Sequence, residues 1–248
     1  MSFKDRLRAG AILRGVVSVI PSAVVAEAVA SAGADFVMID REHGPISRET
    51  MHAMITATNG TNCAPLVRVP GIDEAEVKIA LDSGAEGIVY PLVRTVSDAE
   101  RCVSLLTYPP VGRRGWGPFV AHSRYGTPLL DYAASVGDRI VCCLLIETIE
   151  AVENIESILA VPEIDFIVMA QFDLSSALGV LGQFDSAPML EAVQTIERAA
   201  KARGVPLGAA ALTAEQSHVM EARGYQVLIN GVDALMLKTQ VSEFSSWS

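Results

Sequence analysis

The chain has 248 residues, of which half are hydrophobic and 19% are charged, with a net charge of −10. This composition is typical of a protein with one large buried core. The acidic balance argues against a nucleic-acid partner, because nothing basic is available to replace counterions. An anionic substrate is still compatible with it, because such a substrate needs only one or two local cations.

The start of the chain, MSFKDRLRAG, lacks the apolar centre of a signal peptide. We also find no run of 18 uncharged apolar residues of the kind that spans a membrane. We therefore expect a cytoplasmic protein without a membrane partner.

Eight apolar, β-branched runs alternate with amphipathic segments along the chain. They predict strands at residues 12–20, 36–40, 64–69, 87–93, 141–147, 165–170, 205–212 and 227–231. The runs are nearly continuous rather than alternating, as in the strands of a parallel sheet that is covered on both faces. This pattern predicts a single-domain (β/α)8 TIM barrel over residues 1–248.

The intervening segments carry signals of helix starts and ends. Residues 97–100 and 213–216 have the spacing of a capping box, and Pro188 suits the first turn of a helix. SAGADF, DSGAEGI and EARGYQV each place a glycine between the end of a helix and the next strand. An open doubly wound sheet is the alternative fold, but no GxGxxG follows the first strand, so we expect no dinucleotide or other organic cofactor.

Cysteines and lysines limit the chemistry. The four cysteines (Cys63, Cys102, Cys142 and Cys143) show no CxxC spacing, so we expect buried, reduced thiols rather than disulfides or a zinc site. None of the four lysines (Lys4, Lys78, Lys201 and Lys238) falls at the end of a predicted strand. Imine chemistry on a barrel lysine is therefore disfavoured.

One connection is too long to be a plain turn. Residues 107–127, TYPPVGRRGWGPFVAHSRYGT, are rich in glycine, proline, arginine and aromatic residues. Connections of this length in a compact domain are usually lids or binding loops, and the aromatic and arginine content argues against disorder. We predict a lid or binding loop.

Ionisable residues collect where the predicted strands end, which is where the active site of a (β/α)8 barrel forms. Glu147 ends the fifth strand, and Asp173 lies just beyond the sixth. Two carboxylates on neighbouring strand ends are suited to Mg²⁺ or Mn²⁺, because hard divalent cations prefer oxygen ligands. The alternative is that each carboxylate caps the helix that follows it.

The second and third strands supply the other candidates. His43 follows Asp40 and Glu42, two carboxylates close enough to fix its tautomer and raise its basicity, as a general base requires. Arg68 ends the third strand, where an arginine stabilises an oxyanion or grips a carboxylate. The alternatives are a histidine on a solvated turn and an arginine in a salt bridge to Asp40 or Glu42.

The motifs carry a resemblance to a known family. IDREHGP (39–45) resembles the IDxEHxP signature of the HpcH/HpaI class II pyruvate aldolases, which act on 4-hydroxy-2-oxoheptanedioate and 2-keto-3-deoxy sugar acids. The resemblance extends in order over the whole chain, through VRVP (67–70), ALDSGAEGIVYPLV (80–93), YPPVGRRGWG (108–117), LLIETIEAVENI (144–155), FDLSSALGVLGQ (172–183) and NGVDALML (230–237).

The resemblance implies a site that converts a 2-oxo acid such as pyruvate. Glu147 and Asp173 would hold Mg²⁺ or Mn²⁺, with Co²⁺ as a further candidate, and the metal would stabilise the enolate. His43, oriented by Asp40 and with support from Glu42, would be the acid/base. Arg68 would stabilise the developing oxyanion.

The resemblance also assigns the carboxylate pocket and the assembly. The backbone amides of Phe172 and Asp173, with the side chain of Gln171, would bind the substrate carboxylate. Family members are similar in forming hexamers with exchanged C-terminal helices. Asp82 matches the acidic residue that a neighbouring subunit contributes to the site.

Five positions depart from the family pattern. Ala170-Gln171 stands where the family has Gly-Pro, and Leu145 replaces a glutamine. Arg41 replaces a glycine and Gly44 replaces an alanine beside the candidate histidine. We hypothesise that Arg41, with Arg113 or Arg114, favours an anionic or hydroxylated aldehyde.

The leading function is a metal-dependent class II aldolase that joins pyruvate to an aldehyde or cleaves a 4-hydroxy-2-oxo acid. One alternative is another enolate-forming lyase that uses the same site, such as an oxaloacetate decarboxylase. A third is a 2-oxo acid-binding protein without catalysis. The aldolase and the decarboxylase share every named residue, so the sequence cannot separate them. It also leaves open the aldehyde, the stereochemistry and the metal.

Overall fold

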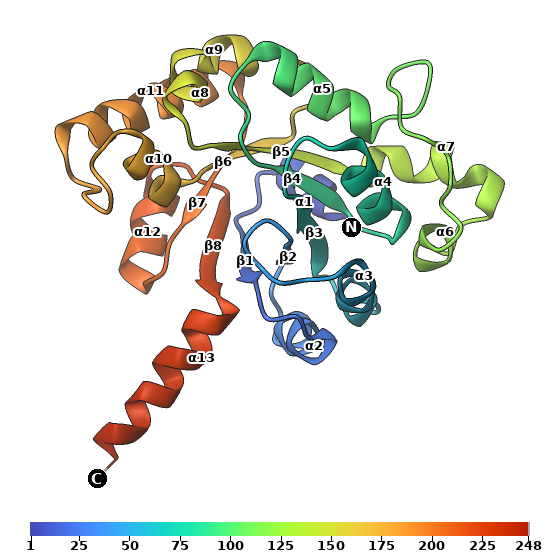
Figure 1. Ribbon diagram of the computed structural model, residues 1–248, viewed down its shortest axis with the longest axis horizontal. Helices are drawn as coiled ribbons and strands as arrows, with labels where there is room; N and C mark the ends of the chain where they lie inside the picture. The colour runs from blue at the N-terminus through green and yellow to red at the C-terminus, as the bar shows by residue number, and fades with distance from the viewer. Residues whose placement is uncertain (248) are drawn as a thin grey trace.

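The computed structural model describes residues 1–247 and forms a closed barrel of eight parallel strands (Figure 1). The strands are β1 (Leu13–Ser18), β2 (Phe36–Asp40), β3 (Ala64–Arg68), β4 (Gly87–Tyr90), β5 (Val141–Ile146), β6 (Phe166–Met169), β7 (Leu207–Ala210) and β8 (Val227–Val232). Each pairs with the next, and β8 pairs with β1. The predicted TIM barrel is confirmed, and every expected strand overlaps an observed one.

Helices surround the barrel on its outer face (Figure 1). They are α1 (Phe3–Arg8), α2 (Ala23–Ser31), α3 (Arg48–Ala57), α4 (Glu74–Asp82), α5 (Val96–Leu106), α6 (Ala121–Arg124), α7 (Tyr132–Val136), α8 (Ile149–Glu153), α9 (Ile155–Ile158), α10 (Gln171–Ala177), α11 (Ala187–Arg203), α12 (Ala214–Ala222) and α13 (Asp233–Ser242), with short 3-10 turns η1 (Leu129–Asp131), η2 (Gly137–Arg139) and η3 (Glu243–Ser246).

Helix boundaries follow most of the expected signals. Thr213 caps α12, Pro188 lies in the first turn of α11, and the glycines that follow α2, α4 and α12 all have positive φ. The capping box expected at residues 97–100 is wrong by two residues. Thr95 caps α5 instead, because the carboxylate of Asp98 reaches back to the Thr95 N–H while the Thr95 hydroxyl accepts from the Asp98 N–H.

Aromatic residues close the N-terminal end of the barrel. Phe3 of α1 packs against Phe36 of β2 and Phe166 of β6, with ring centroids 5.9 and 5.8 Å apart. All three are buried in the cluster that fills the barrel interior. Because this end is plugged, the C-terminal strand ends are left to form the site, as in other barrels of this type.

The four cysteines are buried and free, as expected. Burial raises the pKa of Cys142 and Cys143 well above the ordinary thiol value, so both are neutral thiols at physiological pH. Within the described residues, no helix has the length and apolar character that a membrane span requires.

The long connection at residues 107–127 follows α5 and contains α6. The chain then continues through α7 to β5. A segment that runs from a helix to the next strand lies at the N-terminal ends of the strands, opposite the C-terminal rim. Two of its arginines tie it down there: Arg114 donates to Asp82 at 2.8 Å, and Arg124 donates to the Ile55 carbonyl at 2.9 Å. Within one chain this segment therefore lies away from the C-terminal rim, and its role as a lid or binding loop stays a prediction.

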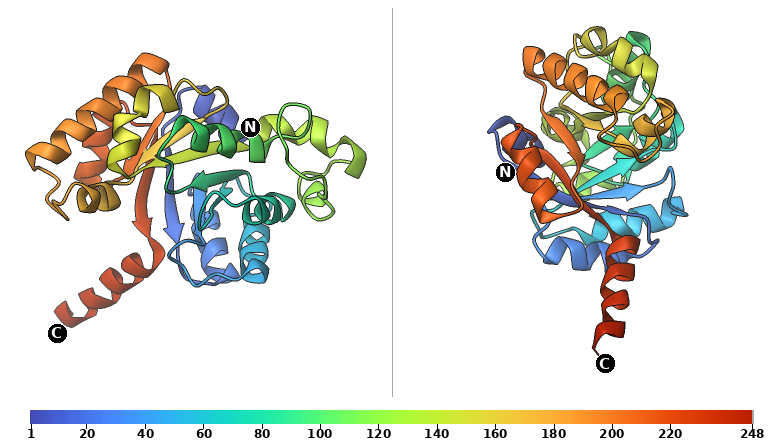
Figure 2. Two further views of the ribbon diagram at one scale, coloured as in Figure 1. Left: turned by 45° about the horizontal axis from the view of Figure 1, so that its top comes forward. Right: turned by 90° about the vertical axis from the view of Figure 1, so that its left-hand side faces the viewer.

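Helix α13 projects away from the barrel in every view (Figures 1 and 2). It exposes several large apolar side chains, which continue into η3: Leu235, Met236, Leu237, Val241 and Phe244. An apolar helix that stands clear of its own barrel is a surface suited to burial against another chain.

A buried ion pair joins α1 to the barrel and can be tested by substitution. Lys4 Nζ lies 2.9 Å from Asp165 Oδ1 and donates to the Ile140 carbonyl at 3.0 Å. We expect Lys4→Met to lower the free energy of unfolding by about 3–5 kcal/mol, because it leaves a buried carboxylate without its partner. Urea denaturation measures this loss.

The double variant Lys4→Met with Asp165→Asn is expected to recover much of the stability, because the uncompensated charge is gone. Lys201→Met, at an exposed position on α11, is the control and leaves the denaturation midpoint unchanged. A Lys4→Met variant as stable as the parent would contradict this assignment.

Candidate active site

Asp40 and Arg68 are the last residues of β2 and β3, and the parallel register places them side by side. Arg68 donates from Nε to Asp40 Oδ1 at 2.9 Å and from Nη2 to Asp40 Oδ2 at 2.5 Å. This two-point pair is the strongest geometry available between an arginine and a carboxylate. Asp40 is fully buried, so the pair is shielded from solvent.

The same carboxylate also fixes the loop that follows β2. Asp40 Oδ1 accepts the backbone N–H groups of Glu42 at 3.0 Å and of His43 at 3.2 Å. Asp40 thus holds the backbone of His43, whereas we expected it to orient the ring. The carboxylate that faces the ring is Glu42, with its Oε2 3.7 Å from His43 Nε2.

Arg68 also reaches Glu42, and Nη1 lies 3.2 Å from Glu42 Oε2. The salt bridges to Asp40 and Glu42 that we named as an alternative are therefore both present. They use one N–H on each guanidinium nitrogen, and since an arginine carries five N–H groups, two are left for a ligand. Burial raises the pKa of Glu42, while the charge of Arg68 opposes that rise.

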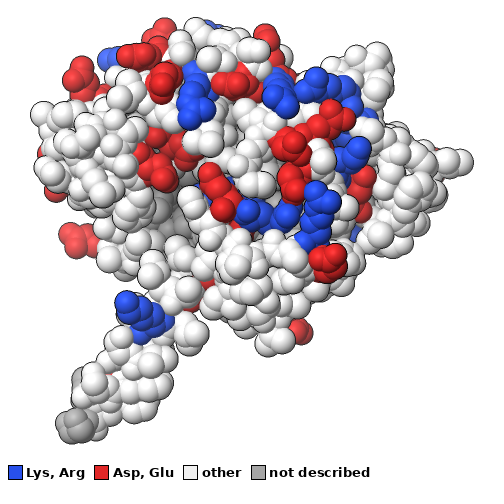
Figure 3. Space-filling model, in the orientation of Figure 1, with Lys and Arg blue, Asp and Glu red and all other residues white. Residues whose placement is uncertain are grey.

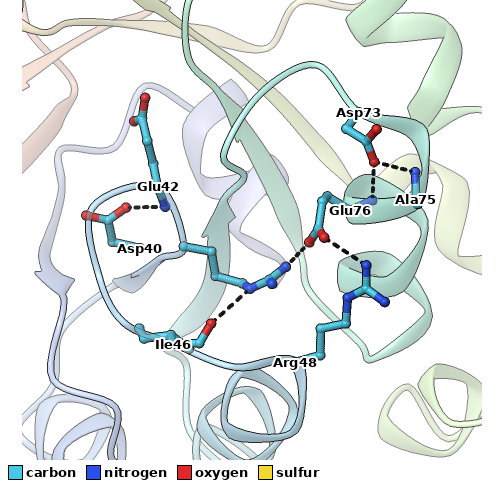
Figure 4. A network of polar contacts seen from close by, with 8 residues as sticks. Asp40, Glu42, Ile46, Arg48, Asp73, Ala75 and Glu76 are labelled. Atoms are coloured by element: carbon cyan, nitrogen blue, oxygen red, sulfur yellow. Dashed lines mark hydrogen bonds and ion pairs between the residues drawn. The ribbon is translucent and has the colours of Figure 1, made fainter.

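A second network holds the outer side of this loop (Figure 4). Arg41 forms an ion pair with Glu76 in the first turn of α4, and its Nε donates to the Ile46 carbonyl at 3.3 Å. Arg48 binds the other oxygen of Glu76 at 2.8 Å. The guanidinium of Arg41 is therefore engaged with Glu76 and is not directed at a substrate.

The structure therefore gives no support to our hypothesis that Arg41 favours an anionic or hydroxylated aldehyde. Arg113 and Arg114 do not support the hypothesis either, because within one chain they belong to the 107–127 connection at the other end of the barrel. Arg114 is engaged there by Asp82.

Only a glycine fits at position 44, because there is no room for a side chain. A Cβ at this position would lie 2.4 Å from the Asp40 carbonyl oxygen and 3.2 Å from Val19 Cα. The loop therefore closes more tightly than an alanine permits. The two departures at Arg41 and Gly44 shape the same turn, which carries His43.

Glu147 follows β5 directly and is buried, with 4% of its surface exposed. Its Oε1 accepts the backbone N–H of Leu92 at 2.5 Å. Thr148, not Glu147, caps α8, and Asp173 lies inside the first turn of α10, whose N-cap is Ala170. The capping alternative for the two carboxylates is therefore wrong.

Leu92 was not expected from the sequence. It has φ of +57°, a conformation that a leucine adopts only at a cost, and this conformation accompanies the N–H bond to Glu147. Nothing in the residue type signals such a backbone, so only the structure could find it.

The two carboxylates fit a divalent cation. Burial raises the pKa of Glu147, and the charges of Glu42 and Asp173 raise it further against the effects of the Leu92 N–H and Arg68. A cation between Glu147 and Asp173 would relieve this repulsion with the oxygen ligands that Mg²⁺ and Mn²⁺ prefer. Among the described residues, no cluster of three or more His, Cys, Asp or Glu side chains is arranged to hold a metal.

A cavity of about 210 Å³ is lined by five of the predicted residues. Its polar lining consists of His43, Arg68, Gln171 and Asp173, with Phe172 beside them. The ring of His43 is 61% exposed, so it is accessible to a ligand. The face of the molecule that carries the loop after β2 shows acidic and basic side chains interspersed across its middle (Figure 3).

Asp40, Glu42, Glu147 and Asp82 are not part of the lining of this cavity. Of these, Asp82 lies at the other end of the barrel. It ends α4, at the N-terminal end of the barrel, and its carboxylate accepts from Arg114. Within one chain Asp82 and the cavity are therefore at opposite ends of the barrel.

Carboxylates, an arginine and a histidine thus gather at the C-terminal rim of a closed parallel barrel, which is the end where the active sites of such barrels form. The model of the HpcH/HpaI aldolase/citrate lyase family matches residues 19–239. The chain therefore belongs to this family, which confirms both the resemblance and the expectation of a carbon–carbon lyase.

Individual proteins agree. The chain is 35% identical to the 2-dehydro-3,6-dideoxy-6-sulfogluconate aldolase of Pseudomonas putida over 90% of its length and 87% of that protein. It is 34% identical to the 4-hydroxy-2-oxovalerate aldolase of Novosphingobium aromaticivorans, over 94% and 88%. An HpcH/HpaI aldolase structure from Desulfitobacterium hafniense is similar with a TM-score of 0.92 and 30% identity, over 99% and 96% of the two chains.

Substitution of Gly44 tests whether the close packing at this position holds the loop after β2. Gly44→Ala is expected to cost about 1–3 kcal/mol, because the added methyl group must displace the Asp40 carbonyl or the Val19 backbone. The amides of Glu42 and His43 are expected to exchange with deuterium faster, because their bonds to Asp40 are disturbed. Hydrogen-exchange mass spectrometry measures this.

Gly71→Ala is the matched control, because a Cβ there meets no atom within 4 Å. It leaves exchange in the loop unchanged. Equal protection of residues 42–43 in Gly44→Ala and the parent would show that the loop does not depend on this packing.

Proposed function

We propose that the protein is a divalent-metal-dependent aldolase that cleaves 4-hydroxy-2-oxo acids to pyruvate, or a related 2-oxo acid, and an aldehyde. The observation that carries the proposal is the arrangement of His43, Arg68 and Asp173 around one cavity. Glu147 lies near them, and the charges of Arg68 and Asp173 act on its pKa. The two similar proteins from Pseudomonas putida and Novosphingobium aromaticivorans, both aldolases, support it.

Glu147 and Asp173 would hold the metal, Mg²⁺ or Mn²⁺. When bound, it acts as a Lewis acid that stabilises negative charge on the 2-oxo acid. The bond from the Leu92 N–H keeps one Glu147 oxygen in place, so the carboxylate is oriented before the ion arrives.

The substrate carboxylate would lie at the start of α10. Ala170 supplies no side-chain cap there, so the first N–H groups of α10, with those of Phe172 and Asp173 among them, receive no bond from the N-cap side chain. Gln171 lines the same cavity and adds an amide donor. Two N–H groups of Arg68 are not bonded to Asp40 or Glu42, and these would face the developing oxyanion.

His43 would move the proton. In the cleavage direction it accepts the proton of the C4 hydroxyl, the C3–C4 bond breaks, and its electrons pass to the pyruvate enolate while the aldehyde leaves. The enolate then takes a proton at C3. Glu42, 3.7 Å from Nε2, stabilises the protonated imidazole that forms in between.

Enolate formation can be measured before the aldehyde is known. In D₂O with Mg²⁺ or Mn²⁺, the protein is expected to exchange the methyl protons of pyruvate for deuterium, which proton NMR detects as loss of the methyl signal. Excess EDTA abolishes exchange. Glu147→Gln abolishes it as well, and His43→Ala slows it by roughly 10²- to 10⁴-fold, the usual contribution of a general base.

The same assay separates the other two functions. Metal binding without exchange favours a non-catalytic 2-oxo acid-binding protein. Exchange with pyruvate, together with release of CO₂ from oxaloacetate but no reaction with any aldehyde, favours a decarboxylase. Absence of exchange with every divalent metal would contradict the proposal.

We further propose a homohexamer that exchanges α13 between subunits. The apolar surface of α13 and the position of Asp82, at the end of the barrel opposite its own cavity, support an assembly in which another chain supplies that carboxylate. Leu237→Asp is expected to break the assembly, because it buries a charge in an apolar interface. Sedimentation velocity measures the change.

Val24→Asp is the control, because Val24 is an exposed apolar residue on α2. It leaves the mass of the assembly unchanged. A parent protein that sediments as a monomer at micromolar concentration would contradict the hexamer.

A further inference from the structure

The position of His43 depends on its backbone more than on its ring. The imidazole side chain is 61% exposed, so little packs around it. Asp40 holds the inner side of the loop after β2 through the N–H groups of Glu42 and His43. The loop therefore needs a second attachment, on its outer side, if it is to keep the ring in one place.

Arg41 supplies the attachment on the outer side. Its backbone N–H donates to the Arg68 carbonyl at 2.9 Å, directly after the pairing of β2 with β3. Its guanidinium donates from Nε to the Ile46 carbonyl at 3.3 Å and pairs through Nη1 with Glu76. One side chain thereby joins the start of the loop to its end, and joins the loop to α4.

The carboxylate that binds Arg41 on α4 is itself held in place (Figure 4). Asp73 caps α4, and its Oδ1 accepts the N–H groups of Ala75 and Glu76 at 2.9 and 3.0 Å. The other oxygen of Glu76 accepts from Arg48 at 2.8 Å. Burial raises the pKa of Glu76, but the hydrogen bonds from Arg48 and Arg41 outweigh it and lower the pKa, so the carboxylate is charged at physiological pH.

Burial distinguishes the two arginines that bind Glu76. The side chains of Arg41 and Glu76 are 10% and 17% exposed, whereas that of Arg48 is 54% exposed. An exposed ion pair contributes little to stability, because water screens it and long side chains must be ordered to form it. The pair between Arg41 and Glu76 is therefore the contact that fixes the loop, and Arg48 adds little to it.

We propose that Arg41 is a positioning residue that acts through His43. By attaching the loop to α4, it holds the imidazole within the distance of the substrate that proton transfer requires. This inference rests on the proposed aldolase function, in which His43 moves the proton. It also gives a role to a position where the family pattern has glycine, which has no side chain with which to form this attachment.

Arg41→Met tests the attachment, because it keeps the aliphatic stem and removes the guanidinium. We expect kcat for metal-dependent deuterium exchange into pyruvate to fall by roughly tenfold or more, since a misplacement of about 1 Å can cost on the order of 10² in rate. KM for pyruvate and the binding of one Mn²⁺ per chain are expected to stay as in the parent. The proposed metal and carboxylate sites lie elsewhere, at the ends of β5 and β6 and on α10.

The His43→Ala background separates a loss of positioning from a loss of folding. If Arg41 acts through His43, Arg41→Met does not lower the residual kcat of His43→Ala any further, so the two losses are not additive. A purely structural contribution would lower kcat by the same factor in both backgrounds. Arg41→Lys, which keeps a cation opposite Glu76, is expected to recover part of the loss.

Arg48→Met is the matched control, because it removes the other arginine that binds Glu76 from a position outside the loop. It leaves kcat unchanged. Glu76→Gln removes the partner charge of Arg41 and is expected to lower kcat in the same direction as Arg41→Met. Hydrogen-exchange mass spectrometry is expected to show faster exchange of residues 41–46 in Arg41→Met and Glu76→Gln, and unchanged exchange in Arg48→Met.

Deuterium exchange into pyruvate by the parent separates the two levels of the proposal. Exchange by the parent, with a loss in Arg41→Met that vanishes in the His43→Ala background, supports both. Exchange by the parent, with kcat unchanged in Arg41→Met or lowered equally in both backgrounds, overturns the positioning role and leaves the aldolase proposal standing. Absence of exchange by the parent with every divalent metal overturns both.

Discussion

The carboxylate of Asp40 is the interaction on which the rest of the site depends. Asp40 ends β2. Its buried carboxylate accepts hydrogen bonds from Nε and Nη2 of Arg68 on β3, and also from the backbone N–H groups of Glu42 and His43. One residue thereby fixes the direction of the guanidinium and the path of the loop that carries His43. Once Arg68 is fixed, its third nitrogen reaches Glu42, which in turn faces the His43 ring.

The outer side of this loop has been rebuilt relative to the family pattern in a mutually consistent way. Gly44 lets the turn close against the Asp40 carbonyl, and Arg41 ties the turn to α4 through Glu76. Because Arg41 is paired with Glu76, it does not offer a free cation to the substrate.

Much of this could be predicted from the sequence, because periodicity and strand ends are local signals. The strands, the barrel and the convergence of His43, Arg68 and Asp173 follow from apolar runs that end in ionisable residues. The position of the 107–127 connection, the engagement of Arg41 by Glu76 and the left-handed backbone of Leu92 could not be predicted. Each depends on contacts between segments distant in sequence or on a backbone conformation that the residue type does not announce.

The central claim is that Glu147 and Asp173 form one metal site, and it is tested most directly by titrating Mn²⁺ into the protein and following the free ion by electron paramagnetic resonance. We expect one ion bound per chain, with binding lost in Glu147→Gln and strongly weakened in Asp173→Asn. Glu150→Gln, an exposed glutamate in the adjacent first turn of α8, keeps full binding. Unchanged Mn²⁺ binding in Glu147→Gln would contradict the claim.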